Sequence, residues 1–369
     1  MTPIKPSPSP GSDVIFHDLP LQSKIKAHYA GLDGLRGVAA LCVVTLHITE
    51  YFRLSVVPEH AYLAVDFFFL LSGFVISRAY DARLDRGMSW TDFLLVRLIR
   101  LYPMIVLGII LGTSVLVVRW WVFHDLTPRS IIWAVVSAAT LTPTPALLYF
   151  RPWAFPVDNP LWSLSLEFLV NVIYAKMFFS LHKSVLFVIV ATGAFAIFFA
   201  AMTIGSLEFG FRWDDFLLGL VRVVFPFFSG ICLARYLNGT RNLRHLGKVA
   251  PLALLVILFF PGAKGWVFDV AATLLLFPII VYVTSRLPPH DRIDRFSFYI
   301  GELSYPLYVI HFPIVVAMSN AAHQSGIIGW RLSLAALVCL LSTAIVACLS
   351  LIFYDRPIRR TLSGVLRNK

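Results

Sequence analysis

Long apolar segments separated by short polar ones follow one another along the chain from residue 34 onward. A transmembrane helix needs about 20 mostly apolar residues, and ten segments approach or exceed that length, 249–263 being the shortest. The predicted spans are residues 34–53, 61–80, 98–122, 160–181, 184–204, 215–236, 249–263, 265–285, 299–320 and 327–353. We therefore predict an all-α fold, a polytopic membrane helix bundle with about ten transmembrane helices.

Residues 130–150 form a further apolar segment, which Pro143 and Pro145 interrupt. Lys and Arg residues concentrate in cytoplasmic segments and therefore indicate which loops face inward. If the N-terminus is inside and residues 130–150 do not cross, most of the 31 Lys and Arg residues fall on the cytoplasmic side. We predict that both termini are cytoplasmic and that residues 130–150 form a re-entrant or surface helix on the outer side.

The composition supports a membrane protein. Hydrophobic residues make up 58% of the chain and charged residues 14%, whereas a soluble domain carries about a quarter charged residues. The net charge of +11 would suggest nucleic-acid binding in a soluble protein, but basic cytoplasmic loops explain it here, so we expect no nucleic-acid partner. We also expect neither a disulfide nor a metal site, because four cysteines in apolar segments lack ligand spacing: Cys42, Cys232, Cys339 and Cys348.

The two ends of the chain differ from the apolar middle. Residues 1–30 contain PSPSPGS and a mixed polar segment, without the apolar core of a signal peptide. We expect them to form a disordered, polar cytoplasmic tail. Residues 31–355 form the predicted membrane domain, and residues 356–369 form a basic cytoplasmic tail.

The first predicted span carries an arginine and a histidine on one face. Arg36 and His47 are eleven residues apart, which rotates a helix by a net angle of only about 20° and advances it by about 16 Å. Arg36 would therefore lie at the cytoplasmic interface and His47 in the outer half. A hydrogen bond to a neighbouring helix would explain His47 equally well, and Asp33 would either cap the helix or pair with Arg36.

Two carboxylates enter the predicted spans near their outer ends. Counted from these ends, His47, Asp66 and Glu167 fall in one layer roughly 7–10 Å below the outer boundary. A carboxylate beside a histidine fixes its tautomer and stabilises the imidazolium, which suits a general base. The small residues Ser72 and Gly73 are expected to allow close helix packing.

Other polar residues lie within spans three, six and nine or directly before them. Arg97 and Arg100 are either ordinary cytoplasmic anchors or a clamp for a phosphorylated ligand. Arg222 lies inside a span and requires a carboxylate or phosphate partner. Three residues on one face of the ninth span are expected to line a site or support the structure: Ser304, Tyr308 and His311.

Five motifs in this order resemble the acyltransferase-3 family of bacterial integral-membrane O-acyltransferases. They are LDGLRGVAALCVVTLH, VDFFFLLSGFVISR, RLIRLYP, PLWSLSLEF and LSYPLYVIH, and the resemblance covers residues 31 to 355. The family's Arg-x10-His, Arg-x-x-Arg and Trp-Ser-Leu-x-x-Glu patterns fall on Arg36 and His47, on Arg97 and Arg100, and on Trp162, Ser163, Leu164 and Glu167. Glu302 departs from the family pattern, so no role is transferred to it. We expect the stand-alone form, without the SGNH domain that some members carry.

The resemblance implies an enzyme of the bacterial cytoplasmic (inner) membrane. It would move an acyl group, often acetyl, from cytosolic acyl-CoA such as acetyl-CoA to a hydroxyl of a cell-surface or secreted glycan or glycoconjugate, without a metal. His47 would be the general base, with Asp66 or Glu167 orienting it.

The resemblance also implies two binding regions. Arg97 and Arg100, together with Arg36, would hold the phosphates of the acyl-CoA. The acceptor would contact Trp162, Ser163, Tyr308 and His311. The alternative is a glycoconjugate or small-solute transporter, or a flippase, that uses the same buried polar residues as a proton relay. The sequence leaves the oligomeric state open.

Overall fold

The computed structural model describes residues 29–145, 152–237, 244–262, 264–287 and 291–367. Residues 1–28 of the expected N-terminal tail lie outside the described residues, and the first helix begins at Ala30, the last residue assigned to that tail. Within these ranges, nine helical segments are long and apolar enough to cross a membrane. They are built by α2 (Ala30–Tyr51), α3 (Ala64–Asp85), α4 (Trp90–Phe123), α6 (Leu161–Met177), α7 (Lys183–Ile204), α8 (Gly219–Tyr236), α10 and α11 (Trp266–Ala271 and Phe277–Thr284), α12 (Asp291–Gln324) and α13 (Trp330–Ser350).

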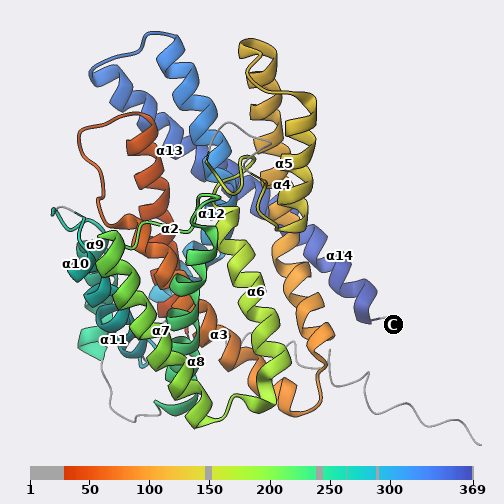
Figure 1. The fold of residues 1–369 in the computed structure, drawn as a ribbon, viewed down its shortest axis with the longest axis vertical. Coiled ribbons are helices and arrows are strands. Elements are labelled where there is room, and N and C mark those ends of the chain that lie inside the picture. Colours follow the sequence, from red (N-terminus) through yellow and green to blue (C-terminus); the bar gives the residue numbers. More distant parts are fainter. Residues whose placement is uncertain (1–28, 146–151, 238–243, 263, 288–290, 368–369) are drawn as a thin grey trace, which may run out of the picture.

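The predicted polytopic helix bundle is thus confirmed, with one difference in length (Figure 1). The span expected at 249–263 forms α9 (Arg244–Leu258), whose apolar part, Val249–Leu258, is shorter than the others. Short turns of other helix types extend the spans. They are 3₁₀ turns at Ala61–Leu63, Phe178–Ser180 and Phe216–Leu218, and π-helical turns at Ala272–Leu276 and Leu351–Asp355.

The apolar segment after α4 forms a short helix, α5 (Pro128–Thr140), that packs against α4. The hydroxyl of Thr127 accepts a hydrogen bond from the backbone N–H of Ser130, and Pro128 opens the first turn, so the sequence caps this helix well. Thirteen residues extend only about 20 Å, less than the roughly 30 Å hydrocarbon core. The described part of residues 130–150 therefore adds no spanning helix, as predicted; residues 146–150 lie outside the described residues.

Glycines let the central helices approach closely. A Cβ added to Gly73 of α3 would lie 1.9 Å from the carbonyl oxygen of Phe227 on α8, and one added to Gly230 would lie 2.2 Å from the carbonyl oxygen of Leu70. The packing role predicted for Gly73 is therefore confirmed. Helix α2 runs beside α12 in the same manner, and these contacts fix the core of the bundle.

The segment before α6 enters the bundle between α4 and α12. A Cβ at Gly112 of α4 would lie 2.0 Å from the carbonyl oxygen of Val157, and a Cβ at Gly108, one turn away, would lie 3.0 Å from Oδ2 of Asp158. Backbone hydrogen bonds anchor this segment, including one from Ala154 N–H to the carbonyl oxygen of Phe211. Helix α6 consequently begins within the bundle rather than at its edge.

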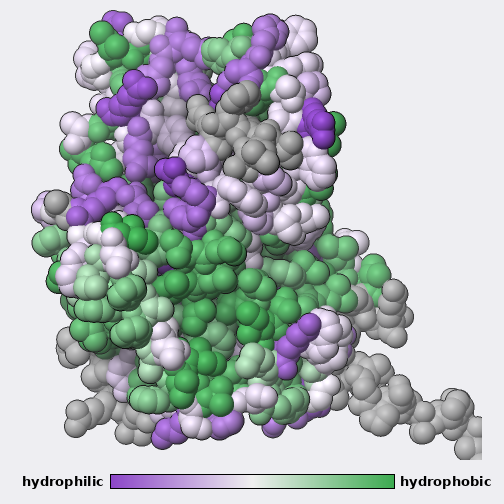
Figure 2. Space-filling view, in the orientation of Figure 1, coloured by the Kyte–Doolittle hydropathy of each residue, from purple (hydrophilic) through white to green (hydrophobic). Residues whose placement is uncertain are grey.

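The surface separates into two zones. Figure 2 shows hydrophobic residues gathered over the lower part of the face and hydrophilic residues toward the top, where α4 joins α5 and α12 joins α13. At the C-terminal end, the π-helical turn Leu351–Asp355 leads into α14 (Arg356–Arg367). The segment expected as a basic tail is thus helical through Arg367.

Candidate active site

Helix α2 connects the two polar regions of the site. At its first turn, Nη1 of Arg36 donates a hydrogen bond of 2.9 Å to Oδ1 of Asp33, so Asp33 pairs with Arg36. Three turns later, the ring of His47 is stacked on that of His311, with centroids 5.3 Å apart and planes at 22°. Phe312 contacts the same ring edge-on at 5.4 Å.

The acid that lies beside His47 is on its own helix. Nδ1 of His47 lies 3.5 Å from Oε2 of Glu50, one turn away, whereas Asp66 and Glu167 are both engaged by arginines. The side chain of His47 is about one-fifth exposed. Sequence reasoning missed Glu50, although its place three residues after His47 was a readable signal.

His311 presents an unused nitrogen to the site. Its Nδ1 lies 2.7 Å from the carbonyl oxygen of Tyr308, and because a carbonyl only accepts, Nδ1 carries the hydrogen. In the neutral ring Nε2 is therefore an acceptor, and it is buried without a hydrogen-bond partner among the described residues. The hydroxyl groups of Tyr308 and Ser163 lie 2.7 Å apart, so these three expected site residues do come together.

Glu167 lies at the arginine level instead of the histidine level. Its Oε1 accepts hydrogen bonds from Ser72 at 2.6 Å and from Nη2 of Arg97 at 3.0 Å, and its charge acts on Arg36. The shared layer expected for His47 and Glu167 is therefore not observed, because α6 begins deep inside the bundle. Ser72, expected to be a packing residue, is a hydrogen-bond donor to Glu167.

Asp66 is held in a buried ion pair with Arg222. The guanidinium donates to both carboxylate oxygens, at 2.6 and 3.2 Å, and to the backbone carbonyls of Phe209 and Tyr62. The carboxylate partner predicted for Arg222 is thus Asp66. The ring of Trp162 lies 5.2 Å from the guanidinium carbon, which places this expected acceptor residue against the ion pair.

The arginines of the RLIRLYP motif gather beside Arg36. Arg97 is 4% exposed, and its Nε has no hydrogen-bond partner among the described residues. Arg100 is exposed, and its charge repels those of Arg36 and Arg97. The structure therefore brings Arg36, Arg97 and Arg100 into one cationic group.

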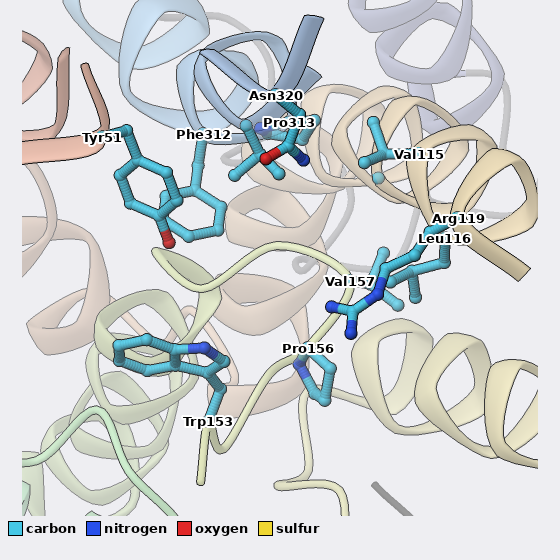
Figure 3. Close-up of a pocket in the computed structure, with 12 residues that line it drawn as sticks. Tyr51, Val115, Leu116, Arg119, Trp153, Pro156, Val157, Phe312, Pro313 and Asn320 are labelled. Carbon is cyan, nitrogen blue, oxygen red and sulfur yellow. The ribbon is translucent and has the colours of Figure 1, made fainter. Parts of the chain in front are cut away.

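A pocket of about 60 Å³ opens at the other end of α2. Figure 3 shows Tyr51, Phe312 and Trp153 along one side, with Arg119 and Val157 opposite. Arg119 is paired with Asp125. Because Phe312 contacts the His47 ring and also lines the pocket, the pocket lies one aromatic ring away from His47.

Asp158 is a second residue that sequence reasoning missed. It is fully buried, and neither carboxylate oxygen has a hydrogen-bond partner among the described residues. Burial raises the pKa of Asp158 well above its usual value, because the low-dielectric interior disfavours the charged carboxylate. The only available signal was its place directly before the polar face of α6. In the part of the chain that is described, no group of three or more His, Cys, Asp or Glu side chains is arranged to hold a metal ion.

The fold and site define a multi-pass membrane protein with a cationic group and a stacked histidine pair joined by one helix. The family model described as "Acyltransferase domain" matches residues 29–353. The chain therefore belongs to the acyltransferase-3 family and is a membrane O-acyltransferase.

Several curated proteins are similar to this chain. The chain is 37% identical to "Protein 2 in picA locus" of Rhizobium radiobacter over 155 residues, 39% of this chain and 80% of that protein. It is 25% identical to a putative O-acetyltransferase of Staphylococcus aureus (strain COL) over 77% of this chain and 50% of that protein. It is 23% identical to O-acetyltransferase OatA of Staphylococcus aureus (strain NCTC 8325 / PS 47) over 89% of this chain and 57% of that protein. The chain thus spans about half the length of these staphylococcal relatives, and no solved structure matches it.

Proposed function

We propose that this enzyme transfers an acyl group, in the simplest case acetyl, from cytosolic acyl-CoA to a hydroxyl of a cell-surface or secreted glycan. It would act in the bacterial inner membrane with both termini in the cytoplasm. One observation carries this proposal: α2 links a cationic group at Arg36 to His47 beside a pocket near the opposite end of the helix.

The donor would bind at the cationic group. Arg36, Arg97 and Arg100 offer guanidinium donors to phosphate oxygens, the geometry that arginine suits best. The pantetheine arm would then extend along the face of α2, which advances about 16 Å between Arg36 and His47. Glu167 and Ser72 lie on this route, and Glu167 would position Arg97 through their 3.0 Å hydrogen bond.

His47 would act as the general base. Its Nε2 would take the proton of the acceptor hydroxyl while the new C–O bond forms at the thioester carbonyl. The C–S bond then breaks, and the leaving thiolate takes the proton from the imidazolium. Glu50, whose Oε2 lies 3.5 Å from Nδ1 without a hydrogen bond, would stabilise the imidazolium by its charge. This is the role expected for Asp66 or Glu167, but the arginines occupy those two carboxylates.

The acceptor would bind in the pocket near His47. The faces of Tyr51, Trp153 and Phe312 suit the C–H surface of a sugar ring, and Asn320 offers an amide to its hydroxyls. Trp162, Ser163, Tyr308 and His311 would form the deeper part of this site. The O-acetyltransferase names of the relatives support the reaction, and the acceptor class rests on the pocket and the family.

The test is acceptor-dependent release of CoA from acetyl-CoA by the purified protein, offered lipopolysaccharide, peptidoglycan fragments and aryl glycosides. His47→Gln should lower this rate about 10²–10⁴-fold while CoA still binds. His182→Gln, which alters an exposed histidine at the start of α7, is the matched control and should behave as wild type. Unchanged turnover in His47→Gln would refute the base, and glycoconjugate transport without CoA release would support the transporter.

A further inference from the structure

Helix α14 lies against the cationic group of Arg36, Arg97 and Arg100, although no sequence motif indicated that it does. It packs on α4, and the π-helical turn Leu351–Asp355 precedes it. A π turn inserts an extra residue and changes which side chains face a neighbour, and such turns are frequent at functional sites. Here it accompanies a buried acid, Asp355, which is only 1% exposed.

Asp355 and Arg359 join the arginines of α4. Nη2 of Arg359 lies 2.5 Å from Oδ2 of Asp355, and both charges act on Arg100. Tyr305 of α12 donates a hydrogen bond of 2.6 Å to the carbonyl oxygen of Leu101. The charges of Asp355 and Arg100 also act on its hydroxyl. Residues from α4, α12 and α14 thus form one continuous polar cluster.

Several donors in this cluster lack acceptors. Nε of Arg359 and Nε of Arg97 are buried without a hydrogen-bond partner among the described residues. Arg100 makes no hydrogen bond or ion pair within those residues. Both carboxylate oxygens of Asp355 are likewise buried without a hydrogen bond in the described part of the chain, so Arg359 and Asp355 form an ion pair by distance alone. An unpaired buried donor costs about 1–3 kcal/mol, so the donors of Arg97 and Arg359 favour an acceptor that arrives with a ligand.

The charges favour an anion. Four arginines meet three acids: Arg36, Arg97, Arg100 and Arg359 against Asp33, Glu167 and Asp355. Arg356 and Glu302 add one charge of each sign and leave this balance unchanged, since Nη2 of Arg356 lies 2.5 Å from Oε2 of Glu302. This pair also accounts for the acid at position 302, for which the family pattern offered no role.

We propose that Arg359, together with Arg97 and Arg100, binds a phosphate group of the acyl donor, so that α14 forms one wall of the donor site. This inference rests on the proposed function, because it takes acyl-CoA as the donor. Guanidinium groups with free N–H donors bind phosphate oxygens in pairs. A phospholipid headgroup offers the same phosphate chemistry from a second source, which the experiment must separate.

The experiment measures the affinity of the full-length protein for CoA and for pantetheine, which lacks every phosphate. The protein is held in nanodiscs of phosphatidylcholine. Arg359→Gln should weaken CoA binding about tenfold, the loss of one charge-assisted hydrogen bond, and change pantetheine binding less than about twofold. Arg360→Gln removes the same charge from the exposed neighbouring position and should change neither affinity.

Arg359→Gln leaves Asp355 without its cation, so a second variant guards against loss of folding. Asp355→Asn with Arg359→Gln removes both charges and should show the same selective loss of CoA binding. An equal loss for CoA and pantetheine, or no loss, overturns the role of Arg359. The role is also overturned if phosphatidylglycerol nanodiscs weaken CoA binding to the wild type, and Arg359→Gln removes this lipid effect without changing CoA affinity in phosphatidylcholine. Wild-type protein that binds no CoA at all overturns the proposed donor itself.

Discussion

Two arginine–carboxylate pairs within this bundle differ in how completely their hydrogen-bonding groups are used. Arg222 is 1% exposed, and its three nitrogens all donate, to Asp66 and to two backbone carbonyls. Arg97 is also buried but reaches Glu167 through Nη2 alone, and its Nε has no partner within the described residues. The first pair is closed and the second is open.

The difference separates structure from function. A buried charge is tolerated when every donor is satisfied, and the Asp66–Arg222 pair meets this condition by fixing α3 to α8 and to the segment at Phe209. The Arg97–Glu167 pair lies among further arginines with free donors, so it has capacity left for a ligand. Both pairs satisfy the rule that intramembrane charges find partners, but only the Arg97–Glu167 pair has an unused buried donor among the described residues.

The largest expected effect is loss of the closed pair. Arg222→Ala leaves Asp66 as an uncompensated buried acid and should destabilise the protein by about 3–5 kcal/mol. Thermal unfolding of the detergent-solubilised protein measures this. Arg212→Ala, at an exposed arginine, should unfold as wild type. Replacing both partners, Asp66→Leu with Arg222→Met, should recover much of the stability; wild-type stability in Arg222→Ala would contradict the structural role.

Breaking the open pair should affect the donor more than the fold. Glu167→Gln removes the charge that orients Arg97, so we expect kcat/KM for acetyl-CoA to fall about 10–100-fold, as for a hydrogen bond to a charged group. Unfolding should occur within a few degrees of wild type, because Glu167 is partly exposed. Ser72→Ala, which removes the other donor to Glu167, should have a smaller effect. A large loss of stability with unchanged kinetics would make this pair structural as well.

The smallest expected effect concerns Asp158, a buried carboxylate that is not paired with an arginine among the described residues. Asp158 has a raised pKa in the folded protein, so the unfolded chain ionises first and stability falls as pH rises past the usual aspartate range near 4. Asp158→Asn removes this penalty and should unfold a few degrees higher than wild type at pH 8, with little difference at pH 4. Thermal unfolding at pH 4, 6 and 8 tests it. If Asp158→Asn is instead less stable than wild type at pH 8, the prediction is wrong, because this result would mean that a cation stabilises the Asp158 carboxylate.

Local periodicity was enough to predict much of this protein. The apolar segments predicted the helices, with α9 shorter than expected, and the eleven-residue spacing placed Arg36 and His47 on one face of α2. These features depend on residues close in the chain, so a helix period and a span length determine them. Close helix packing at Gly73 was predictable from the small size of the residue.

The partners of the site residues were decided only by the tertiary structure. Depth counted from span ends predicted Glu167 in one layer with His47, but the segment carrying Val157 and Asp158 enters the bundle, and Glu167 lies at the level of Arg97. The pairing of Asp66 with Arg222, the stacking of His47 on His311 and the approach of Arg359 to Arg100 join residues far apart in the chain. No local pattern encodes them, because they depend on which helices pack side by side and where each one begins.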